Sequence, residues 1–384
     1  MGSHAVDVKQ QPWVLQFCHG YDAPFLDCAR QYAALFIGTP FKVCTVYLTG
    51  SPNPEVETRS VSDKVIFLDY SSREVRGLKL KAIRDLKRIA SSRDFKFCIA
   101  HRFKPIYIAL LGMDMPVIGV QHAFDVYSRS SRRLFVNLFK KRLTLLGVSD
   151  AVRDDMRGHL RGWPDEHIQT LYNRIDVEAV QAEQMPREAA RASLDLPQDV
   201  WVIGNVGRLH PDKDQATLIR GFAQAWKQLP PGSLLAIMGR GPLEESLKSL
   251  AKQLGIDEHV RFLGQVPNGR QYFKAFDAFA LTSDHEPFGM VLLEAMAAGV
   301  PIICSDCGGG REVAQGIGRM TPLGDASALA TTLIQQAHCS AEEIQLLRKN
   351  MQRKLEQCFS DQVIRQKFWS LPTLSCYADQ NNHA

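Results

Sequence analysis

Short apolar runs alternate with longer segments of helical periodicity along most of the chain. In the first half, runs such as WVLQFC (13–18) and FKFCIA (95–100) show no polar alternation, which is typical of strands buried on both faces. The strands expected here cover 13–18, 42–48, 65–70, 95–100, 116–121, 143–149 and 168–172, and helices are expected at 24–36, 73–92, 105–111, 130–139 and 150–160. This order predicts a parallel sheet with helices on both faces.

A polar segment with two prolines, EQMPREAARASLDLPQD (183–199), interrupts the pattern and predicts a connector with a short helix. The pattern then starts again, with strands expected at 201–207, 234–239, 260–264, 278–283 and 301–306, and helices at 214–228, 242–254, 269–276, 289–298 and 340–357. The expected fold class is therefore α/β, with two Rossmann-like, doubly wound parallel-sheet domains at 1–180 and 200–358, joined by a connector at 181–199.

The length of 384 residues also favours two domains. The net charge of +5 hides an asymmetry, because residues 1–175 hold 26 Lys and Arg against 17 Asp and Glu. The positive charge gathers in 73–96 and 129–142, which suggests an anionic partner such as phosphate groups or a membrane surface. Ordinary solvated helix faces would explain the same pattern. Nucleic acid is not expected, because no nucleic-acid-binding motif accompanies the basic residues.

The nine cysteines are scattered through expected strands and helices, which indicates reduced thiols rather than a disulfide framework. Cys304 and Cys307 have the C-x-x-C spacing of metal and redox sites, but no second ligand pair follows, so no metal site is expected. No apolar run approaches the about 18 residues that a membrane span needs. The first residues lack the apolar core of a signal peptide, so a cytoplasmic protein is expected.

In doubly wound sheets, ligands bind at the carboxyl ends of the strands, so the strand-to-helix loops are the places to search. The loop after the strand at 201–207 reads GRLHPDK, and its Arg208 and Lys213 are suited to a diphosphate. The next such loop contains Gly239, which permits close approach of the backbone to a ligand. Two solvated surface cations and an ordinary turn are the alternatives.

The segment TSDHEPFGMVLLEAMAAGVP (282–301) predicts a helix that is apolar on nearly every side yet carries Glu294 in its middle and Glu286 at its approach. A carboxylate among apolar residues is costly unless it is paired, so ligand hydroxyls or a neighbouring Arg or Lys must satisfy it. The first turn of this helix, 288–291, offers unpaired N–H groups to an anion.

In the first half, His101 and His122 each end a strand, which favours a functional role over a purely structural one. Asp125, Tyr127, Arg129 and Arg132 follow, and these four are expected to border an acceptor pocket with His122.

These motifs resemble the retaining glycosyltransferases of the GT-B fold, in particular the large family with many bacterial polysaccharide and lipopolysaccharide enzymes. The resemblance rests on G-R-x4-K at 207–213, E-x-x-F-G-x4-E at 286–294 and GGGREV at 308–313, with looser matches in GVSDAVRDDM and LYNRID. It covers roughly 13–335. It implies two Rossmann-like domains that face a central cleft, and a C-terminal segment, 359–384, that crosses back to the first domain.

The resemblance also implies roles for single residues. Arg208 and Lys213 bind the diphosphate of a nucleotide-sugar donor, Glu286 holds the transferred sugar beside His101, and Glu294 holds the ribose. Further donor contacts are implied for Gly20, Gly239, Arg261, Phe262, Leu263, Phe288, Gly289, Met290 and Val291, with the loop at 261–263 beside the base. Gly20 stands in HGYD, where family members often carry a Gly-Gly pair. Acceptor contacts are expected from His122, Asp125, Arg129 and Arg132.

The implied function is transfer of a sugar, as in hexosyltransferases, from a nucleotide-diphosphate donor to a glycan or glycolipid such as lipopolysaccharide core. The donor expected is a UDP-sugar, although the residues do not choose between UDP, GDP and ADP, and no metal or other cofactor is expected. The basic first half suggests peripheral attachment to an anionic membrane surface. A nucleotide-sugar 2-epimerase or hydrolase on the same fold is the alternative. A catalytically inactive relative is disfavoured because Arg208, Lys213, Glu286 and Glu294 occur together.

Overall fold

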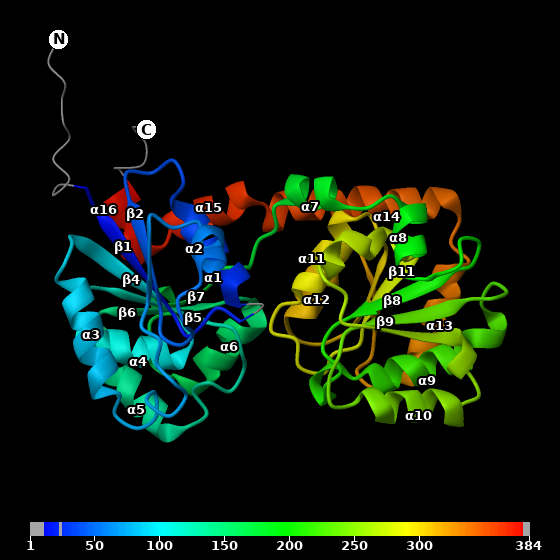
Figure 1. Ribbon diagram of the computed structural model, residues 1–384, viewed down its shortest axis with the longest axis horizontal. Helices are drawn as coiled ribbons and strands as arrows, with labels where there is room; N and C mark the ends of the chain where they lie inside the picture. The colour runs from blue at the N-terminus through cyan, green and yellow to red at the C-terminus, as the bar shows by residue number, and fades with distance from the viewer. Residues whose placement is uncertain (1–10, 23–24, 379–384) are drawn as a thin grey trace, which may run out of the picture. The chain divides into compact units, whose positions relative to one another are not determined.

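The computed structural model describes residues 11–22 and 25–378 (Figure 1). They form two compact units. The first holds the described residues up to Asn173 together with those from Ile364 onward, and the second holds Arg174–Val363. The first unit thus takes in most of the C-terminal segment that was expected to cross back.

The first unit is built on a seven-stranded sheet in the order β3-β2-β1-β4-β5-β6-β7, and every pairing is parallel. Its strands are β1 Trp13–Cys18, β2 Lys42–Tyr47, β3 Lys64–Phe67, β4 Phe95–His101, β5 Val117–Gln121, β6 Leu143–Gly147 and β7 Ile168–Thr170. The continuous apolar runs are buried along almost their whole length in β1, β4, β5 and β6. The expected parallel sheet, covered on both faces, is confirmed.

The helices of the first unit include one that the pattern placed wrongly at its start. They are α1 Phe25–Ala33, α2 Pro54–Arg59, α3 Leu80–Ala90, α4 Phe103–Gly112, α5 Ser130–Leu138, α6 Asp150–His159, the second part of α15 Asp361–Trp369, and α16 Ser375–Ala378. The helix expected at 73–92 begins only at Leu80, because Gly77 and Lys79 both have positive φ. Residues in this left-handed conformation cannot continue a right-handed helix.

The second unit holds a six-stranded parallel sheet in the order β10-β9-β8-β11-β12-β13. Its strands are β8 Val202–Val206, β9 Leu234–Met238, β10 Val260–Gly264, β11 Ala278–Leu281, β12 Ile302–Ser305 and β13 Arg319–Thr321. The short edge strand β13 was not expected, because RMT carries no apolar run. Both sheets have the arrangement of doubly wound α/β domains.

The helices of the second unit are α7 Val177–Glu183, α8 Arg187–Ser193, α9 Gln215–Ala225, α10 Glu244–Gln253, α11 Met290–Ala297, α12 Gly308–Ala314, α13 Ala326–Ala337 and α14 Ala341–Lys354. The helix expected at 269–276 is the 3-10 helix η6, Gly269–Ala275, and α14 passes into a π-helical turn at Leu355–Phe359. Helices α12 and α13 were missed, the first because three glycines, 308–310, are poor helix formers.

The polar segment at 183–199 is anchored by a buried charge. The guanidinium of Arg191, on α8, is fully buried and donates to the carboxylate of Asp277 at 2.8 Å and to the carbonyl oxygens of four further residues, Pro197, Gln198, Val200 and Ala275. Asp277 also accepts from the backbone N–H of Val202 at the start of β8. A buried Arg needs such a full set of acceptors. The segment expected as a connector therefore packs as part of the second unit.

The crossing C-terminal segment makes contacts that fix its ends. Arg174, for which the sequence offered no role, is buried and forms an ion pair of 2.8 Å with Asp361 at the start of α15. Further along α15, the guanidinium of Arg365 donates to the carbonyl oxygens of Ala34 and Ile37 in the first unit. Charge and hydrogen bonds thus hold both ends of α15.

Candidate functional site

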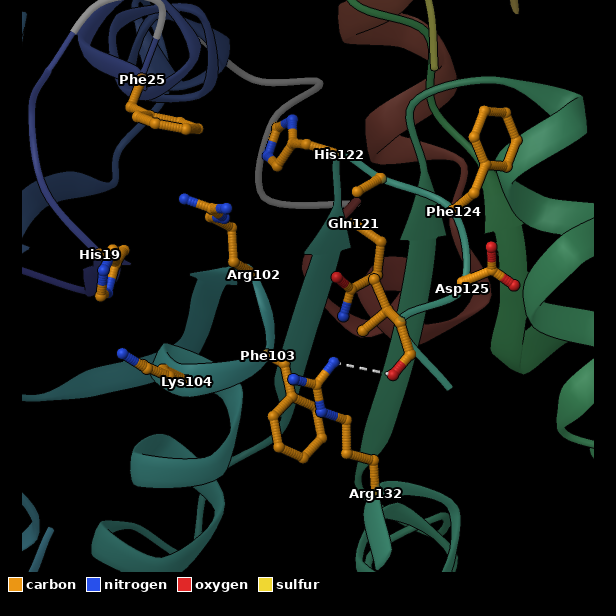
Figure 2. Close-up of a pocket in the computed structure, with 12 residues that line it drawn as sticks. His19, Phe25, Arg102, Phe103, Lys104, Gln121, His122, Phe124, Asp125 and Arg132 are labelled. Carbon is orange, nitrogen blue, oxygen red and sulfur yellow. Dashed lines mark hydrogen bonds between the residues drawn. The ribbon is translucent and has the colours of Figure 1, made fainter. Parts of the chain in front are cut away.

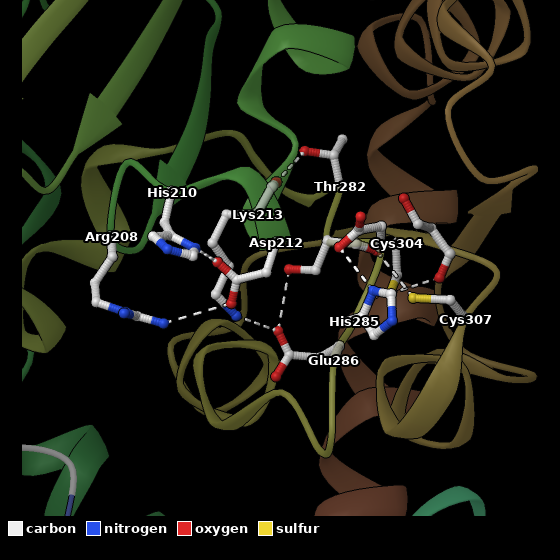
Figure 3. Close-up of polar contacts among 12 residues, drawn as sticks. Arg208, His210, Asp212, Lys213, Thr282, His285, Glu286, Cys304 and Cys307 are labelled. Atoms are coloured by element: carbon white, nitrogen blue, oxygen red, sulfur yellow. Dashed lines mark hydrogen bonds and ion pairs between the residues drawn. The ribbon is translucent and has the colours of Figure 1, made fainter. Parts of the chain in front are cut away.

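Two loops of the second unit, one after β8 and one after β11, are tied together at the carboxyl ends of their strands (Figure 3). The hydroxyl of Thr282 donates to the carbonyl oxygens of Lys213 and Asp214, at 3.1 and 3.0 Å. The backbone N–H of Asp284 donates to the carbonyl oxygen of Asp212. Because β8 and β11 are neighbours in the sheet, two segments about 70 residues apart meet at one place.

An ion pair joins the same two loops. The ammonium Nζ of Lys213 lies 2.7 Å from the carboxylate Oε2 of Glu286, and the side chains are only 19% and 10% exposed. The hydroxyl of Ser283 donates to the same carboxylate oxygen at 3.1 Å. The structure therefore brings together the two residues that the resemblance placed on the diphosphate and on the sugar.

Arg208 is the more accessible of the two predicted cations. Its side chain is 69% exposed, and its only ion pair among the described residues is a long one, 3.4 Å, to Asp212. Asp212 in turn contacts the imidazole of His210. A weakly held guanidinium on the surface is free to turn toward a ligand, whereas Lys213 is already fixed.

Glycines let the loops around this place pack closely. A Cβ at Gly239, where φ is +147°, would lie 1.8 Å from the carbonyl oxygen of Gly207. A Cβ at Gly309 would lie 2.3 Å from the carbonyl oxygen of Pro287, and the Gly309 N–H donates to the carbonyl oxygen of Glu286. At both positions, a side chain would collide with the backbone of a neighbouring loop, and this accounts for the glycine. The role of Gly239 in donor binding stays a prediction.

Helix α11 begins one residue later than expected, with Gly289 as its N-cap at φ +95°. No side chain caps the helix, so the first-turn N–H groups from Met290 onward lack a side-chain acceptor. Phe288 is buried against the ring of Phe359, so only its backbone can face a ligand. Glu294 lies half-buried on this helix.

The residues expected beside the base lie in a strand, not in a loop. Arg261, Phe262 and Leu263 are part of β10, at the edge of the sheet. Arg261 is exposed and donates to the carbonyl oxygen of Glu258. The strand expected at 260–264 is thus confirmed, and the description of 261–263 as a loop was wrong, because the apolar run VRFLG continues as strand up to Gly264.

Of the cysteine pair beside the ion pair, only Cys307 bonds to the loop after β11. The thiol of Cys307 donates to the carbonyl oxygen of Ser283 at 2.9 Å, and that of Cys304 to the carbonyl oxygen of Ser305. Burial raises the pKa of both thiols, which favours their neutral form.

The first unit contains a cavity of about 420 Å³ at the carboxyl ends of its strands (Figure 2). It follows β1, β4 and β5 and takes side chains from the starts of α1 and α4 and from α5. Its lining consists of His19, Phe25, Arg102, Phe103, Lys104, Gln121, His122, Ala123, Phe124, Asp125, Val126 and Arg132. Gly20, expected near the donor, is buried next to His19 and packs on Thr49.

The two strand-end histidines meet, but only one lines the cavity. Nδ1 of His101 lies 3.2 Å from Nε2 of His122, and their rings are stacked. His101 is 5% exposed and packs edge-on against Tyr32, so it supports His122 from behind. Burial, and then His122, lower the pKa of His101 well below its usual value.

The second unit is similar to a known protein family. Residues 186–354 match the family described as Glycosyl transferases group 1, and this stretch holds both loops of the ion pair. The matched stretch, which makes up most of the second unit, is therefore similar to the group 1 glycosyltransferases.

Relatives agree in sequence and in fold. The chain is 35% identical over 149 residues, 38% of its length, to the lipopolysaccharide core biosynthesis glycosyltransferase LpsE of Rhizobium meliloti (strain 1021), and it spans 42% of that relative. A glycosyltransferase of Rickettsia africae ESF-5 has a TM-score of 0.82 at 14% identity, over 98% of this chain and 100% of its own. Anabaena HepE in complex with UDP-glucose has a TM-score of 0.76 at 21% identity, over 95% and 99%. The fold is GT-B.

The residues expected at the acceptor fall into three sets. His122, Asp125 and Arg132 line the cavity. Arg129 is exposed at the N-cap of α5 and is not part of the lining. Tyr127 was wrongly expected at a pocket, because it is fully buried and its hydroxyl accepts from the amide of Gln121.

Sequence reasoning missed two cations of the cavity. Arg102 and Lys104 follow His101 in the stretch HRFK, where the N-terminus of α4 follows β4. The signal was present, since basic residues at a strand's carboxyl end were the reason for choosing Arg208 and Lys213.

A possible metal-binding trio borders the cavity. Ligand atoms of Asp125, Asp155 and His159 all lie within 4.8 Å of one another. Asp125 is exposed, and its backbone N–H already holds the carboxylate of Asp155. The hydrogen bond between Asp125 and Asp155 accounts for the close approach of these two residues. That the protein needs no metal stays a prediction.

The cavity histidines make the protein sensitive to acid. The pKa of His19 is lowered to about 4 by burial and then by Lys104 and Arg102, and the pKa of His122 is lowered to about 4 by burial and then by Arg102. The unfolded chain therefore binds more protons than the folded one between pH about 6.5 and about 4. The free energy of unfolding should fall as the pH drops through this range.

NMR titration of the imidazole signals checks this directly, with both histidines expected to stay neutral at pH 5.5. In a variant with His19→Asn and His122→Asn, the acid-induced loss of stability should be smaller. Midpoints near pH 6.5 for both signals would contradict the account.

Proposed function

We propose that this chain is a retaining glycosyltransferase that moves a sugar from a nucleotide-diphosphate donor, a UDP-sugar, to a glycan or glycolipid acceptor of the lipopolysaccharide-core type. The observation that carries the proposal is the Lys213–Glu286 ion pair at the strand ends of the domain that matches the family. Relatives support it, since two are lipopolysaccharide core biosynthesis glycosyltransferases and a protein of similar fold was solved in complex with UDP-glucose.

In this reaction, the bond between the anomeric carbon and the diphosphate oxygen breaks, and its electron pair leaves with the diphosphate. The acceptor hydroxyl attacks the same face of the sugar and gives its proton to the departing diphosphate. No glycosidase-like pair of carboxyl groups is needed. The enzyme's task is to stabilise the negative charge that develops on the leaving group.

The second unit offers fixed positive charge for that task. Lys213 supplies an ammonium that is already positioned, Arg208 a guanidinium that can fork onto phosphate oxygens, and α11 an uncapped N-terminus. Because these groups can replace a divalent cation, we propose that no metal is required. Glu286 takes hydroxyls of the transferred sugar and Glu294 those of the ribose.

Turnover of the donor tests the proposal. Lys213→Ala should lower kcat for UDP release from UDP-sugars by about 100-fold or more, as other losses of charge stabilisation do. Lys248→Ala is the matched control, because Lys248 forms an exposed ion pair with Glu244 in the same unit. A wild-type rate in Lys213→Ala would contradict the proposed role of Lys213 in stabilising the leaving diphosphate.

The same assay separates the finer parts of the proposal. Rates that are unchanged by EDTA would support metal independence, and NMR of the product would report the anomeric configuration. Product with inverted configuration would overturn the retaining mechanism, and free sugar as the only product in the presence of glycan acceptors would indicate a hydrolase.

We also propose attachment to an anionic membrane surface. No described helix has the length and apolar character needed to cross a bilayer. Helices α3, α4 and α5 adjoin one another, because Phe103 and Tyr107 contact Phe135, and α3 packs on α4. Exposed leucines stand on or beside α3 and α5, and basic residues are interspersed with them: Leu78, Leu80, Leu134, Leu138, Lys81, Arg84, Lys87, Arg88, Lys140 and Lys141. Exposed apolar side chains among cations are typical of interfacial helices.

Vesicle sedimentation tests this surface. The protein should bind vesicles with anionic phosphatidylglycerol better than neutral phosphatidylcholine vesicles, and salt should weaken the binding. Leu80→Ser with Leu138→Ser should reduce it, whereas Leu346→Ser, an exposed leucine of the second unit, should not. Absent or salt-insensitive binding would contradict the proposal.

A further inference from the structure

The cavity of the first unit holds more positive than negative charge. Arg102, Lys104 and Arg132 face Asp125 as the one carboxylate of the lining. Arg102 and Lys104 form no ion pair within the described parts of the chain, and Asp125 lies near His159, at 3.6 Å. By contrast, Lys213 at a strand end of the second unit is paired with Glu286. An excess of positive charge that no described carboxylate balances is suited to an anionic ligand.

Aromatic rings hold two of the cations in place. The guanidinium of Arg102 lies 4.6 Å from the ring centre of Phe25, and that of Arg132 lies 4.7 Å from the ring centre of Phe103. Arg132 also donates to the carbonyl oxygen of Val126 at 3.0 Å. Stacked guanidinium groups lose little conformational freedom when they bind a ligand, because they are already ordered. Figure 2 shows these side chains, with Lys104, around one open space.

The backbone adds donors and strain at the same place. Arg102 is the N-cap of α4 with φ +73° and ψ 164°, a region that non-glycine residues rarely adopt. Its N–H is used by the carbonyl oxygen of Val120, but no side chain caps the helix. In the first turn of this ten-residue helix, Pro105 has no N–H and the N–H of Ile106 donates to the carbonyl oxygen of Arg102, so the N–H groups of Phe103 and Lys104 remain at its positive end.

The neighbouring histidines complete the site without adding charge. His19 and His122 are neutral at physiological pH, since burial and the nearby cations lower each pKa to about 4. A neutral imidazole both donates and accepts hydrogen bonds, so it is suited to a sugar hydroxyl. Cations for an anion thus stand next to hydrogen-bonding groups for a sugar.

We propose that this cavity is a phosphate subsite for the acceptor, and that Arg102 and Lys104 bind a phosphomonoester carried on the acceptor sugar. A phosphomonoester has three acceptor oxygens and a charge near −2, which suits a forked guanidinium, an ammonium and uncapped N–H groups better than a single carboxylate does. The inference rests on the proposed function, because it assigns the cavity to the acceptor. The candidate cations for the donor, Arg208 and Lys213, belong to the second unit, whereas the whole cavity belongs to the first.

Calorimetry with simple probes tests the subsite. Glucose 6-phosphate should bind the wild-type protein, inorganic phosphate should bind more weakly, and glucose should not bind measurably. Arg102→Gln and Lys104→Gln should each weaken glucose 6-phosphate about tenfold or more, the loss expected for one hydrogen bond to a charged group. Lys64→Gln, an exposed cation on β3 outside the cavity, is the matched control and should bind as the wild type does.

Lys104→Gln protects the test against misfolding, because Lys104 does not share the unusual backbone of Arg102. No binding of glucose 6-phosphate by the wild type, or equal binding by both cavity variants, would overturn the subsite. Equal affinity for inorganic phosphate and glucose 6-phosphate would indicate a site for free phosphate and would also overturn it.

A parallel titration with UDP keeps the two proposals apart. If UDP binds the wild type and glucose 6-phosphate does not, only the phosphate subsite fails. If UDP does not bind but glucose 6-phosphate does, and both cavity variants weaken it, the proposed donor chemistry fails while the cationic cavity stands. Arg102→Gln and Lys104→Gln should bind UDP as the wild type does, and a parallel loss of UDP would contradict the assignment of the cavity to the acceptor.

Discussion

The ammonium of Lys213 and the carboxylate of Glu286 lie 2.7 Å apart, in the loops that follow two neighbouring strands. Both side chains are largely removed from water, and each would be costly without the other. The pair therefore fixes the distance between the loops, and the hydroxyl of Thr282 and the glycines of α12 pack around it. Any ligand at these strand ends meets a cation and an acid whose positions are already set.

The fixed positions of Lys213 and Glu286 affect which ligand can bind between them. A diphosphate that approaches Lys213 competes for an ammonium that Glu286 has neutralised, while sugar hydroxyls can take over the hydrogen bonds of Glu286. Phosphate and sugar on one ligand can thus satisfy both partners at once, whereas a phosphate alone would leave the acid unpaired. Under the proposed function, this arrangement is suited to a nucleotide-sugar rather than to inorganic phosphate.

In the first unit, the cations at the strand ends are not paired with carboxylates of the described residues. Arg102 and Lys104 are held by an aromatic ring and a helix start instead of a carboxylate, and no described acid pairs with them. A site with unpaired cations binds an anion most strongly when water is displaced and the anion is multiply charged. The two units therefore suit different ligands, although both are doubly wound sheets with their candidate sites at the strand ends.

The two parallel sheets could be predicted from the sequence, because continuous apolar runs leave few alternatives to buried parallel strands. The position of Lys213 and Glu286 was also predictable, since adjacent strand ends bring their loops together. The direction in which a side chain points after a strand end could not be predicted. Tyr127 follows a strand end as Asp125 does, yet it turns into the core, and the direction depends on packing that no motif records. Arg102 and Lys104 were recognisable as cations at a strand end, but their grouping with Arg132 in one cavity was not, because distant segments build that cavity.

The most direct test of the central claim is a calorimetric titration of wild type and Glu294→Gln with UDP, GDP, ADP and UDP-glucose in the presence of EDTA. The account predicts that one nucleotide, UDP, binds selectively without metal, that UDP-glucose binds more tightly than UDP, and that Glu294→Gln weakens both. If none of the nucleotides binds, or if Glu294→Gln binds as tightly as the wild type, the proposed donor site is contradicted.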